Sequence, residues 1–512
     1  MQIEAVNYVG KDRRAIGSDP RDAGAIVSTN PAKPDEIVWS GNPSVEDVQS
    51  AIDAARQAQH AWNRAGIEER ERVLRVYQEL ANADAEEMGK LIMREVGKAA
   101  WDSLGEAKAL GAKVDITLSH GVGAGRERVQ SFEVGVTETR RGVARFRAHG
   151  VMAVLGPFNF PAHLPNGHMV PALLMGNTVV LKPSDKAPAV GQRLANLFRQ
   201  ALEQCGHNPA IVSLVHGGVD VAKALVTNNG IEGVLFTGSW AAGRAILEAN
   251  LNSPGKIIAL EMGGNSPSVV MNDADLKAAA IEVARSAFVT TGQRCTCTRR
   301  LIVQRDVADE MLERVAKIAR GLRVGDPEGE AGEAVFMGPL VTEDSAQAVI
   351  ETQAKYAASG AEILVESQRL DRAGHYVTPG VMRVERFSQG EDGCGADIET
   401  FGPLLRATVV DSLDEAIEQA NATRYGLASA IFTQDTELQE RFLTESRAGC
   451  VNVNTGTAGA SGKLPFGGLG ISGNHRPAGS FSLDYCAMPV ASLIETDASV
   501  AGVLPGMNVS ND

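Results

Sequence analysis

Gly233-Val-Leu-Phe-Thr-Gly-Ser239 is a short apolar run that ends in a glycine turn and leads into a segment of helical spacing. Such a run is typical of a buried strand that passes directly into a helix. Four similar runs surround it, at residues 151–155, 178–181, 211–215 and 257–260. Segments with helical periodicity, such as 190–205 and 219–226, lie between them. This alternation predicts βαβ units and a mainly parallel sheet.

The rest of the chain extends this pattern. A second alternating series, from Ala274 to about residue 432, predicts another α/β domain. Near the N-terminus, helical spacing begins after Ser44, and a further helical pattern runs over residues 68–95. Residues 127–148 alternate like a strand and end in four arginines, which favours a hairpin or an edge arm.

Composition narrows the functional classes. The chain has 512 residues, 44% hydrophobic and 22% charged, which is ordinary for a globular protein of several domains. Its net charge of −14 and the lack of a basic run argue against a nucleic-acid partner. There is no signal-like N-terminus and no apolar run of about 18 residues, so we expect no membrane partner and a cytoplasmic location. Six scattered cysteines predict neither a disulfide framework nor a metal site.

A cysteine follows a Gly-Gln turn in Phe288-Val-Thr-Thr-Gly-Gln-Arg-Cys295. A thiolate attacks carbonyl carbons well, and this position suits a nucleophile. The alternative is a buried structural cysteine, which is the common fate of an isolated thiol. Cys297 lies two residues further on and is expected to be a packing residue.

Two polar residues could act with that thiol. Glu261 follows the apolar run 257–260, so it lies near the end of a buried strand, where ligands bind in open parallel sheets. A carboxyl group buried there would have a raised pKa, as suits a general base, although it could instead cap the Gly263-Gly264 turn. Asn159 lies between two prolines, and its amide is a candidate donor to an oxyanion.

Three further segments suit a nucleotide, although each could also be a plain turn. The Thr237-Gly238-Ser239 turn, with Gly243 after it, opens a helix whose N–H groups can bind phosphate. Lys182 ends a strand and is followed by Pro, Ser184 and Asp185, where the acid could accept ribose hydroxyls and would repel a 2′-phosphate. A third acid stands on a rigid turn in the segment 399–403.

These motifs, in this order, resemble the aldehyde dehydrogenase superfamily over nearly the whole chain, including Pro465-Phe-Gly-Gly468 and Ser472-Gly473. The resemblance implies a Rossmann-like NAD-binding domain, an α/β catalytic domain and a small β oligomerisation arm. It assigns 1–131 and 150–261 to the first and 262–461 to the second, with 462–483 as a returning segment. The arm comprises 132–149 and 484–497, and 498–512 is a tail. The family also implies a homodimer or homotetramer.

The resemblance implies roles as well. Cys295 would attack an aldehyde, Asn159 and the Cys295 N–H would hold the oxyanion, and Glu261 would activate water against the thioester. The cofactor, NAD, would be bound by a set of ten residues: Lys182, Ser184, Asp185, Gly217, Thr237, Gly238, Ser239, Gly243, Glu399 and Phe401. Asp185 stands where the family usually has glutamate, and Ala222 replaces an expected glycine.

Segments 159–168, 292–297 and 472–477 resemble the branch of the family that oxidises N-succinylglutamate 5-semialdehyde, a dicarboxylate aldehyde. Its carboxylates need cationic or hydrogen-bonding partners. The candidates by position are His163, Asn166, His168, Arg294, Ser461 and Lys463. The loop 452–463 departs from the expected form, so succinate or glutamate semialdehyde is an alternative substrate. A non-catalytic relative would lack one of the three catalytic candidates, and acylating relatives usually lack the acid at position 261.

Overall fold

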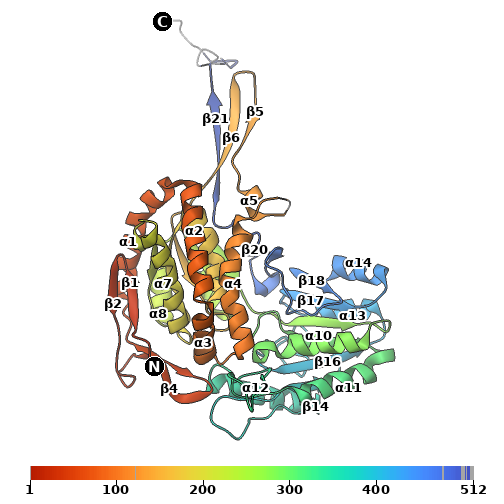
Figure 1. Ribbon diagram of the computed structural model, residues 1–512. Helices are drawn as coiled ribbons and strands as arrows, with labels where there is room; N and C mark the ends of the chain where they lie inside the picture. Colours follow the sequence, from red (N-terminus) through yellow and green to blue (C-terminus); the bar gives the residue numbers. More distant parts are fainter. Residues whose placement is uncertain (1, 122, 475–477, 498–501, 503, 508–512) are drawn as a thin grey trace, which may run out of the picture.

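The computed structural model describes residues 2–121, 123–474, 478–497, 502 and 504–507. Two seven-stranded sheets form the body of the molecule, and a narrow three-stranded sheet projects from it (Figure 1). The expected α/β fold with parallel sheets is confirmed. No helix in the described part of the chain is long and apolar enough to cross a membrane.

The first sheet contains the strands around the Gly233–Ser239 turn. Its order is β11-β10-β7-β8-β9-β1-β2. The bounds are β11 (Ile257–Glu261), β10 (Gly233–Thr237), β7 (Val151–Leu155), β8 (Thr178–Lys182), β9 (Val212–Leu214), β1 (Val6–Val9) and β2 (Asp12–Ala15). The five strands from β11 to β9 are parallel, and β1 joins β9 antiparallel. Their carboxyl ends therefore meet at one edge, where parallel sheets bind ligands.

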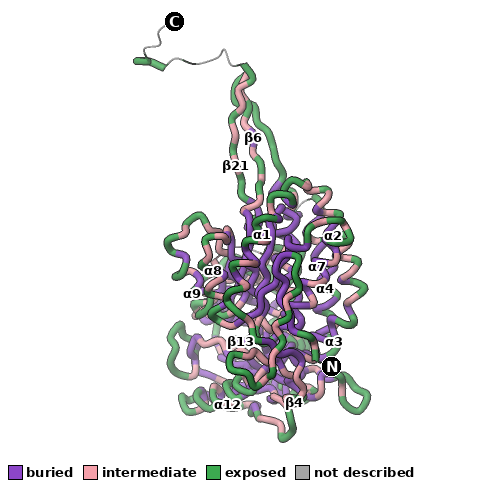
Figure 2. The backbone as a smooth tube through the Cα atoms, turned by 90° about the vertical axis from the view of Figure 1, so that its left-hand side faces the viewer, coloured by how far each residue is buried: buried purple, intermediate pink, exposed green. Residues whose placement is uncertain are grey.

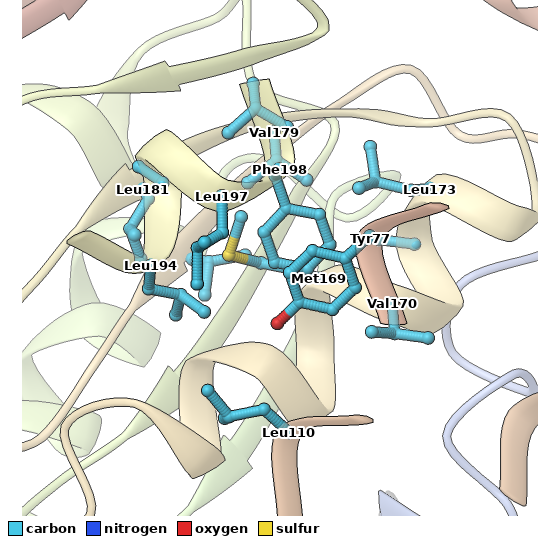
Figure 3. Packing of buried hydrophobic residues seen from close by; sticks show 14 of the residues in the cluster. Tyr77, Leu110, Met169, Val170, Leu173, Val179, Leu181, Leu194, Leu197 and Phe198 are labelled. Atoms are coloured by element: carbon cyan, nitrogen blue, oxygen red, sulfur yellow. The ribbon is translucent and has the colours of Figure 1, made fainter. Parts of the chain in front are cut away.

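Helices cover both faces of this sheet. They are α1 (Glu46–Arg64), α2 (Gly66–Ala83), α3 (Ala85–Val96), α4 (Ala100–Leu118), α6 (His163–Leu174), α7 (Pro188–Gln204), α8 (Val219–Thr227) and α9 (Trp240–Ala249). Figure 3 shows the apolar core between α2, α4, α6, α7 and β8, where the rings of Tyr77 and Phe198 stack with centroids 3.7 Å apart. This core fixes the helices whose ends carry functional residues.

The single helical pattern expected over residues 68–95 is two helices. α2 ends at Ala83 and α3 begins at Ala85. The carboxylate of the residue between them, Asp84, accepts a hydrogen bond of 2.7 Å from Nε of Arg193 on α7. The break between α2 and α3 thus coincides with a hydrogen bond to another helix. The periodicity of the local sequence cannot reveal a contact between residues so far apart in the chain.

The second sheet has the order β14-β15-β16-β13-β12-β17-β18. Its strands are β12 (Ser266–Val270), β13 (Thr298–Gln304), β14 (Glu362–Val365), β15 (Gly380–Arg383), β16 (Leu404–Val410), β17 (Ala428–Phe432) and β18 (Cys450–Val453). Only the β14–β15 pair is antiparallel. One apolar cluster includes α10 (Leu276–Phe288) and α11 (Arg305–Gly321), and another includes α12 (Glu343–Ala358), α13 (Leu413–Asn421) and α14 (Thr436–Glu445).

The projecting sheet is formed by segments far apart in the chain. β5 (Phe132–Gly135), β6 (Arg140–Arg147) and β21 (Met488–Glu495) pair antiparallel in the order β21-β6-β5. It is largely exposed, in contrast to the buried interior of the body (Figure 2). Smaller elements are the β3 (Ile26–Asn30) and β4 (Lys33–Gly41) hairpin, α5 (Gly125–Arg128), and the β19 (Pro465–Phe466) and β20 (Ala478–Gly479) pair.

Candidate active site

A cavity of about 670 Å³ lies at the carboxyl ends of β7, β8 and β10. Residues from the second half of the chain close it, among them Cys295 and Glu399. Ten of the residues singled out in the sequence line this cavity: Asn159, Lys182, Ser184, Asp185, Thr237, Gly238, Ser239, Cys295, Glu399 and Phe401. The fold thus brings the candidate nucleophile and most of the candidate cofactor residues to one site.

Cys295 stands on a strained loop between α10 and β13. Thr290 and Thr291 have φ values of 55° and 56°, a region that β-branched residues rarely adopt. The hydroxyl of Thr290 donates to Oδ2 of Asp102 at 2.5 Å, and that of Thr291 donates to the Gly338 carbonyl at 2.9 Å. Strain of this kind persists only where surrounding contacts hold it, and it concentrates at functional sites. We call residues 289–297 the nucleophile loop.

The surroundings of Cys295 favour the neutral form of its thiol. Burial raises its pKa to about 12, and the nearby carboxyl groups of Glu399 and Glu261 act in the same direction. The guanidinium of Arg299 opposes them and lowers the pKa of this thiol. A neutral thiol is a poor nucleophile, so reaction at Cys295 needs a base close by.

Glu261 ends β11 in the buried position expected from the sequence. Its side-chain oxygens are both buried, and neither has a hydrogen-bond partner among the residues that the structure describes. Burial raises the pKa of this carboxyl group well above its usual value of 4.5. Glu261 itself does not line the cavity, but the next two residues, Met262 and Gly263, do. An unpartnered carboxyl group of raised pKa has the properties of a general base.

Asn159 is held against the nucleophile loop. Its Nδ2 donates a hydrogen bond of 2.8 Å to the carbonyl of Gln293, two residues before Cys295. Nδ2 carries a second hydrogen, and in the described chain no acceptor bonds the backbone N–H of Cys295. Two donors beside one nucleophile are what an oxyanion requires.

Two cavity loops carry the groups that a dinucleotide needs. Lys182 is buried at the end of β8, and burial lowers the pKa of its ammonium group to about 8. Asp185 lies exposed at the cavity edge. Ser239 caps α9, where its hydroxyl oxygen accepts from the Ala242 N–H at 3.3 Å, so that the N-terminus of α9 meets the cavity. Val219, at the start of α8, is 81% exposed and offers an apolar surface.

Glu399 approaches from the opposite wall. Its Oε1 accepts from the Gly264 N–H at 3.0 Å and lies 3.6 Å from Nη2 of Arg299. A Cβ on Gly263 would lie 1.8 Å from Oε2 of Glu399, so the glycine lets this carboxylate approach the backbone closely. The cavity therefore presents a cation, two carboxylates suited to ribose hydroxyls, a helix N-terminus and an apolar surface, and these groups fit NAD.

Two of the expected cofactor residues do not line the cavity. Gly217 is buried behind Gly218, and a Cβ there would strike Val221. A Cβ on Gly243 would lie 2.2 Å from Sδ of Met262, so this glycine lets α9 pack closely on the segment after β11. The placement of both glycines supports close packing rather than contact with a ligand.

Two of the expected substrate residues lie in the interior. The amide of Asn166 accepts from the Tyr77 hydroxyl at 2.6 Å and donates to the Leu110 carbonyl at 3.1 Å. His168 bonds the Tyr485 hydroxyl at 2.9 Å and Oγ1 of Thr237 at 3.3 Å, and burial lowers its pKa to about 3. The expectation that these side chains meet a substrate is corrected here, because both are buried and both bond other parts of the protein.

The other four candidate substrate residues are more accessible to solvent than Asn166 and His168. Arg294 precedes Cys295, and its Nη2 forms an ion pair of 2.8 Å with Oδ1 of Asp102. His163 begins α6 and is partly buried, with its Nδ1 buried and unpartnered among the described residues. Ser461 and Lys463 are exposed on the loop after β18. The neighbouring motif Ser472–Pro477 extends into residues 475–477, which lie outside the described residues.

Sequence reasoning missed the buried charges that hold these loops. Asp102 on α4 binds both Thr290 and Arg294 of the nucleophile loop. Arg299 contacts the Glu399 loop, as described above. The sequence carries no local signal for either, because their partners lie far away along the chain.

Comparisons with known proteins identify the family of the chain. A family model described as the aldehyde dehydrogenase family matches residues 19–489. The N-succinylglutamate 5-semialdehyde dehydrogenase of Caulobacter sp. (strain K31) is 42% identical over 488 residues, which are 95% of this chain and 97% of that protein. The protein of the same name from Sphingopyxis alaskensis is 39% identical over 482 residues, 94% of this chain and 96% of its own.

Solved structures give the same result. The NAD-dependent aldehyde dehydrogenase from Sinorhizobium meliloti superposes with a TM-score of 0.88 at 28% identity, covering 98% of this chain and 96% of that one. Lactaldehyde dehydrogenase from Escherichia coli gives 0.86 at 26% identity, covering 97% and 100%. The family model and the relatives both extend over nearly the whole chain. The protein therefore belongs to the aldehyde dehydrogenase family.

Proposed function

We propose that this protein oxidises N-succinylglutamate 5-semialdehyde to N-succinylglutamate with NAD, in the cytoplasm, as a step of arginine catabolism by the succinyltransferase pathway. The proposed chemistry rests on one observation: a single cavity is lined by Cys295, Asn159 and the loops suited to a dinucleotide. The substrate rests on the relatives at 39% and 42% identity, whose names state it.

The reaction begins at the thiol. The sulfur of Cys295 forms a bond to the aldehyde carbon while the carbonyl electron pair moves to oxygen, and Glu261 accepts the thiol proton. The second hydrogen on Nδ2 of Asn159 and the N–H of Cys295 stabilise the oxyanion. Bound NAD supplies the acceptor for the hydride that leaves this carbon.

Hydrolysis completes the turnover. Glu261, once it has released its proton, accepts a proton from water, and the oxygen of that water attacks the thioester carbon. The carbon–sulfur bond then breaks, and Cys295 leaves as the thiolate, to be reprotonated. The unpartnered oxygens of Glu261 support this role, because no competing hydrogen bond within the described structure must first be broken.

The cofactor preference follows from charge. Lys182 and Asp185 would hold the adenosine ribose, and Glu399 the nicotinamide ribose. Asp185 would repel a 2′-phosphate, which favours NAD over NADP. The remaining cofactor residues, the turn at Thr237–Ser239, Ser184 and Phe401, would shape the cavity around the dinucleotide.

The substrate carries two carboxylates. Arg294 is the candidate partner nearest in the chain to Cys295, and its Nη1 has no hydrogen bond to the described residues, whereas Nε and Nη2 bind Thr290 and Asp102. His163, Ser461 and Lys463 are further candidates. A guanidinium suits a carboxylate in geometry and charge.

The projecting sheet would pair two copies of the chain into a homodimer or homotetramer. Its apolar side chains support this proposal, since Phe132 is 58% exposed and Leu493 is 69% exposed. We propose the same division into domains as the sequence suggested, with this arm as a separate unit. Light scattering coupled to size exclusion would give the number of subunits.

The test of the proposed function is a substrate panel. NADH formation is followed with N-succinylglutamate semialdehyde, succinate semialdehyde, glutamate semialdehyde and a long-chain aldehyde, with Cys295→Ala as the control. We expect the highest kcat/KM for the succinylated substrate. Faster oxidation of another semialdehyde would support the dehydrogenase chemistry and refute the proposed substrate. No turnover that depends on Cys295 would indicate a non-catalytic relative.

A further inference from the structure

Arg299 is a buried arginine whose hydrogen bonds, within the part of the chain that the structure describes, go to backbone carbonyls. It lies on β13, four residues after Cys295, and is 2% exposed. Its Nε donates to Gly264 at 3.3 Å, Nη1 to Thr400 at 2.5 Å and Gly402 at 3.5 Å, and Nη2 to Gly292 at 3.1 Å and Arg294 at 3.0 Å. A guanidinium has five N–H groups, so this set of five acceptors uses its full capacity.

These carbonyls belong to three separate loops. Two lie in the nucleophile loop on either side of Gln293, one in the loop after Glu261, and two in the loop after Glu399. Each loop carries a group to which the proposed reaction gives a role. A planar guanidinium fixes its partners in direction as well as distance, so Arg299 sets these loops relative to one another.

The charge of Arg299 acts at the same place. Nη2 lies 3.6 Å from Oε1 of Glu399. The groups that shift the pKa of the Cys295 thiol are Glu399, Glu261, Cys297 and Arg299, and among these only Arg299 lowers it. The same side chain, Arg299, therefore holds the three loops by hydrogen bonds and places a positive charge near the Cys295 thiol.

We propose that Arg299 is a positioning residue, which holds the nucleophile loop, the Glu261–Gly264 loop and the Glu399 loop in their reactive arrangement and supplies a cation beside Cys295. The inference rests on the proposed function in that Cys295 is the nucleophile. It adds a residue that touches neither aldehyde nor cofactor and acts through the groups that do.

Arg300 offers a matched control. Neighbouring residues of a strand point to opposite faces, and Arg300 donates to the carbonyls of Asn265, Gln419 and Ala420 at 2.7, 2.8 and 2.9 Å. It is as buried as Arg299 but binds the end of α13 instead of the nucleophile and Glu399 loops. Substituting it tests the cost of losing a buried arginine in this strand.

The experiment compares Arg299→Met and Arg299→Lys with Arg300→Met and Arg300→Lys. The rate at which iodoacetamide alkylates Cys295 is measured against pH without aldehyde or NAD, so this readout holds whatever the substrate is. Thermal unfolding, kcat and both KM values accompany it. Methionine removes charge and donors, whereas lysine keeps the charge but donates from one nitrogen and cannot reach three loops.

For Arg299→Met we expect alkylation at pH 9 to slow about tenfold, as loss of a nearby cation raises the thiol pKa. Arg299→Lys should keep the wild-type pH dependence and lose at least about tenfold in kcat, since displaced reacting groups slow the chemistry. Both Arg300 variants should lose stability and keep the wild-type alkylation profile.

Equal kcat losses in Arg299→Lys and Arg300→Lys would overturn the proposal, as would an unchanged alkylation profile in Arg299→Met. If Arg299→Met does not fold, the two lysine variants decide by their kcat values. A missing aldehyde turnover in the wild type would count against the proposed function alone, because the alkylation comparison would still stand.

Discussion

Replacing Glu261 with glutamine tests the assignment of the base. The two side chains have the same shape, and the carboxyl oxygens of Glu261 have no partner in the described structure, so the substitution breaks no hydrogen bond. Stability should change little. The amide cannot accept a proton from water, so thioester hydrolysis should lose the contribution of general-base catalysis, about 100- to 10,000-fold. This range corresponds to about 3 to 5 kcal/mol in the barrier.

If a neighbouring carboxyl group could act as the base in place of Glu261, the loss of activity would be smaller. The structure argues against such a replacement. Glu399 is the other carboxyl group near Cys295, but it is bound by the Gly264 N–H and lies beside Arg299. It is therefore held away from the role of a free base. We expect the loss in Glu261→Gln to be at least about 100-fold in steady-state kcat.

Stopped-flow NADH fluorescence separates the two half-reactions. Because Glu261 is proposed to accept the thiol proton as well as to activate water, Glu261→Gln should slow both the NADH release of the first turnover and the steady-state rate relative to wild type. Cys295→Ala should show no burst. A steady-state kcat within about tenfold of wild type would refute the reasoning, and a first-turnover rate equal to wild type would refute the role of Glu261 as the base for the thiol.

The pH dependence has a definite sign. A base works in its unprotonated form, and burial raises the pKa of Glu261 well above 4.5. Hydrolysis should therefore accelerate as pH rises through a midpoint above that value. The glutamine variant should lose this rise, which pre-steady-state measurements across pH would detect.

Three further outcomes are expected. Asn159→Ala should lower kcat about 100-fold, since it removes one oxyanion donor, and steady-state kinetics with the preferred aldehyde would measure the loss. Alkylation of Cys295 in the absence of NAD should continue to accelerate above pH 9, because the thiol pKa is about 12, and a plateau near pH 9 would contradict the burial argument. Burial raises the pKa of Glu95, which accepts the N–H groups of Ala189 and Val190, from 4.5 to about 7. The folded state then holds the proton more tightly, so this group stabilises the fold below pH 4.5 and the contribution is lost as pH rises to about 7. Urea unfolding at pH 5 and 8 should show a decrease of up to about 3 kcal/mol that Glu95→Gln lacks, and equal pH dependence in both proteins would contradict it.

The sequence predicted the positions of candidate residues best where those positions depend on a local pattern. Glu261 and Lys182 each end a buried strand, as expected, because a polar residue directly after an apolar run must stand at the strand end. The turn at Gly238 opens α9 for the same reason. Such features need only a few consecutive residues, and the parallel sheet then brings them to one edge.

The helix α4 illustrates what local pattern conceals. It spans Ala100–Leu118 and was not predicted, because buried charged residues interrupt its apolar spacing. Those same charges matter most: Asp102 anchors the nucleophile loop, and Glu106 accepts the N–H groups at the start of α6 at 3.0 and 3.1 Å. A buried charge paired with a distant partner looks in sequence like an exposed one.

By itself the sequence determined the α/β architecture and the family, and it singled out a thiol, a carboxyl group and an amide as catalytic candidates, since residue type and spacing along short segments carry these signals. Only the tertiary structure decided that Asn166 and His168 lie in the interior, and that Asp102 and Arg299 hold the nucleophile loop. The physical reason is the distance along the chain between the residues that interact. Strand, turn and motif signals depend on neighbours in the chain, whereas burial and hydrogen bonding depend on partners that meet only when the chain has folded.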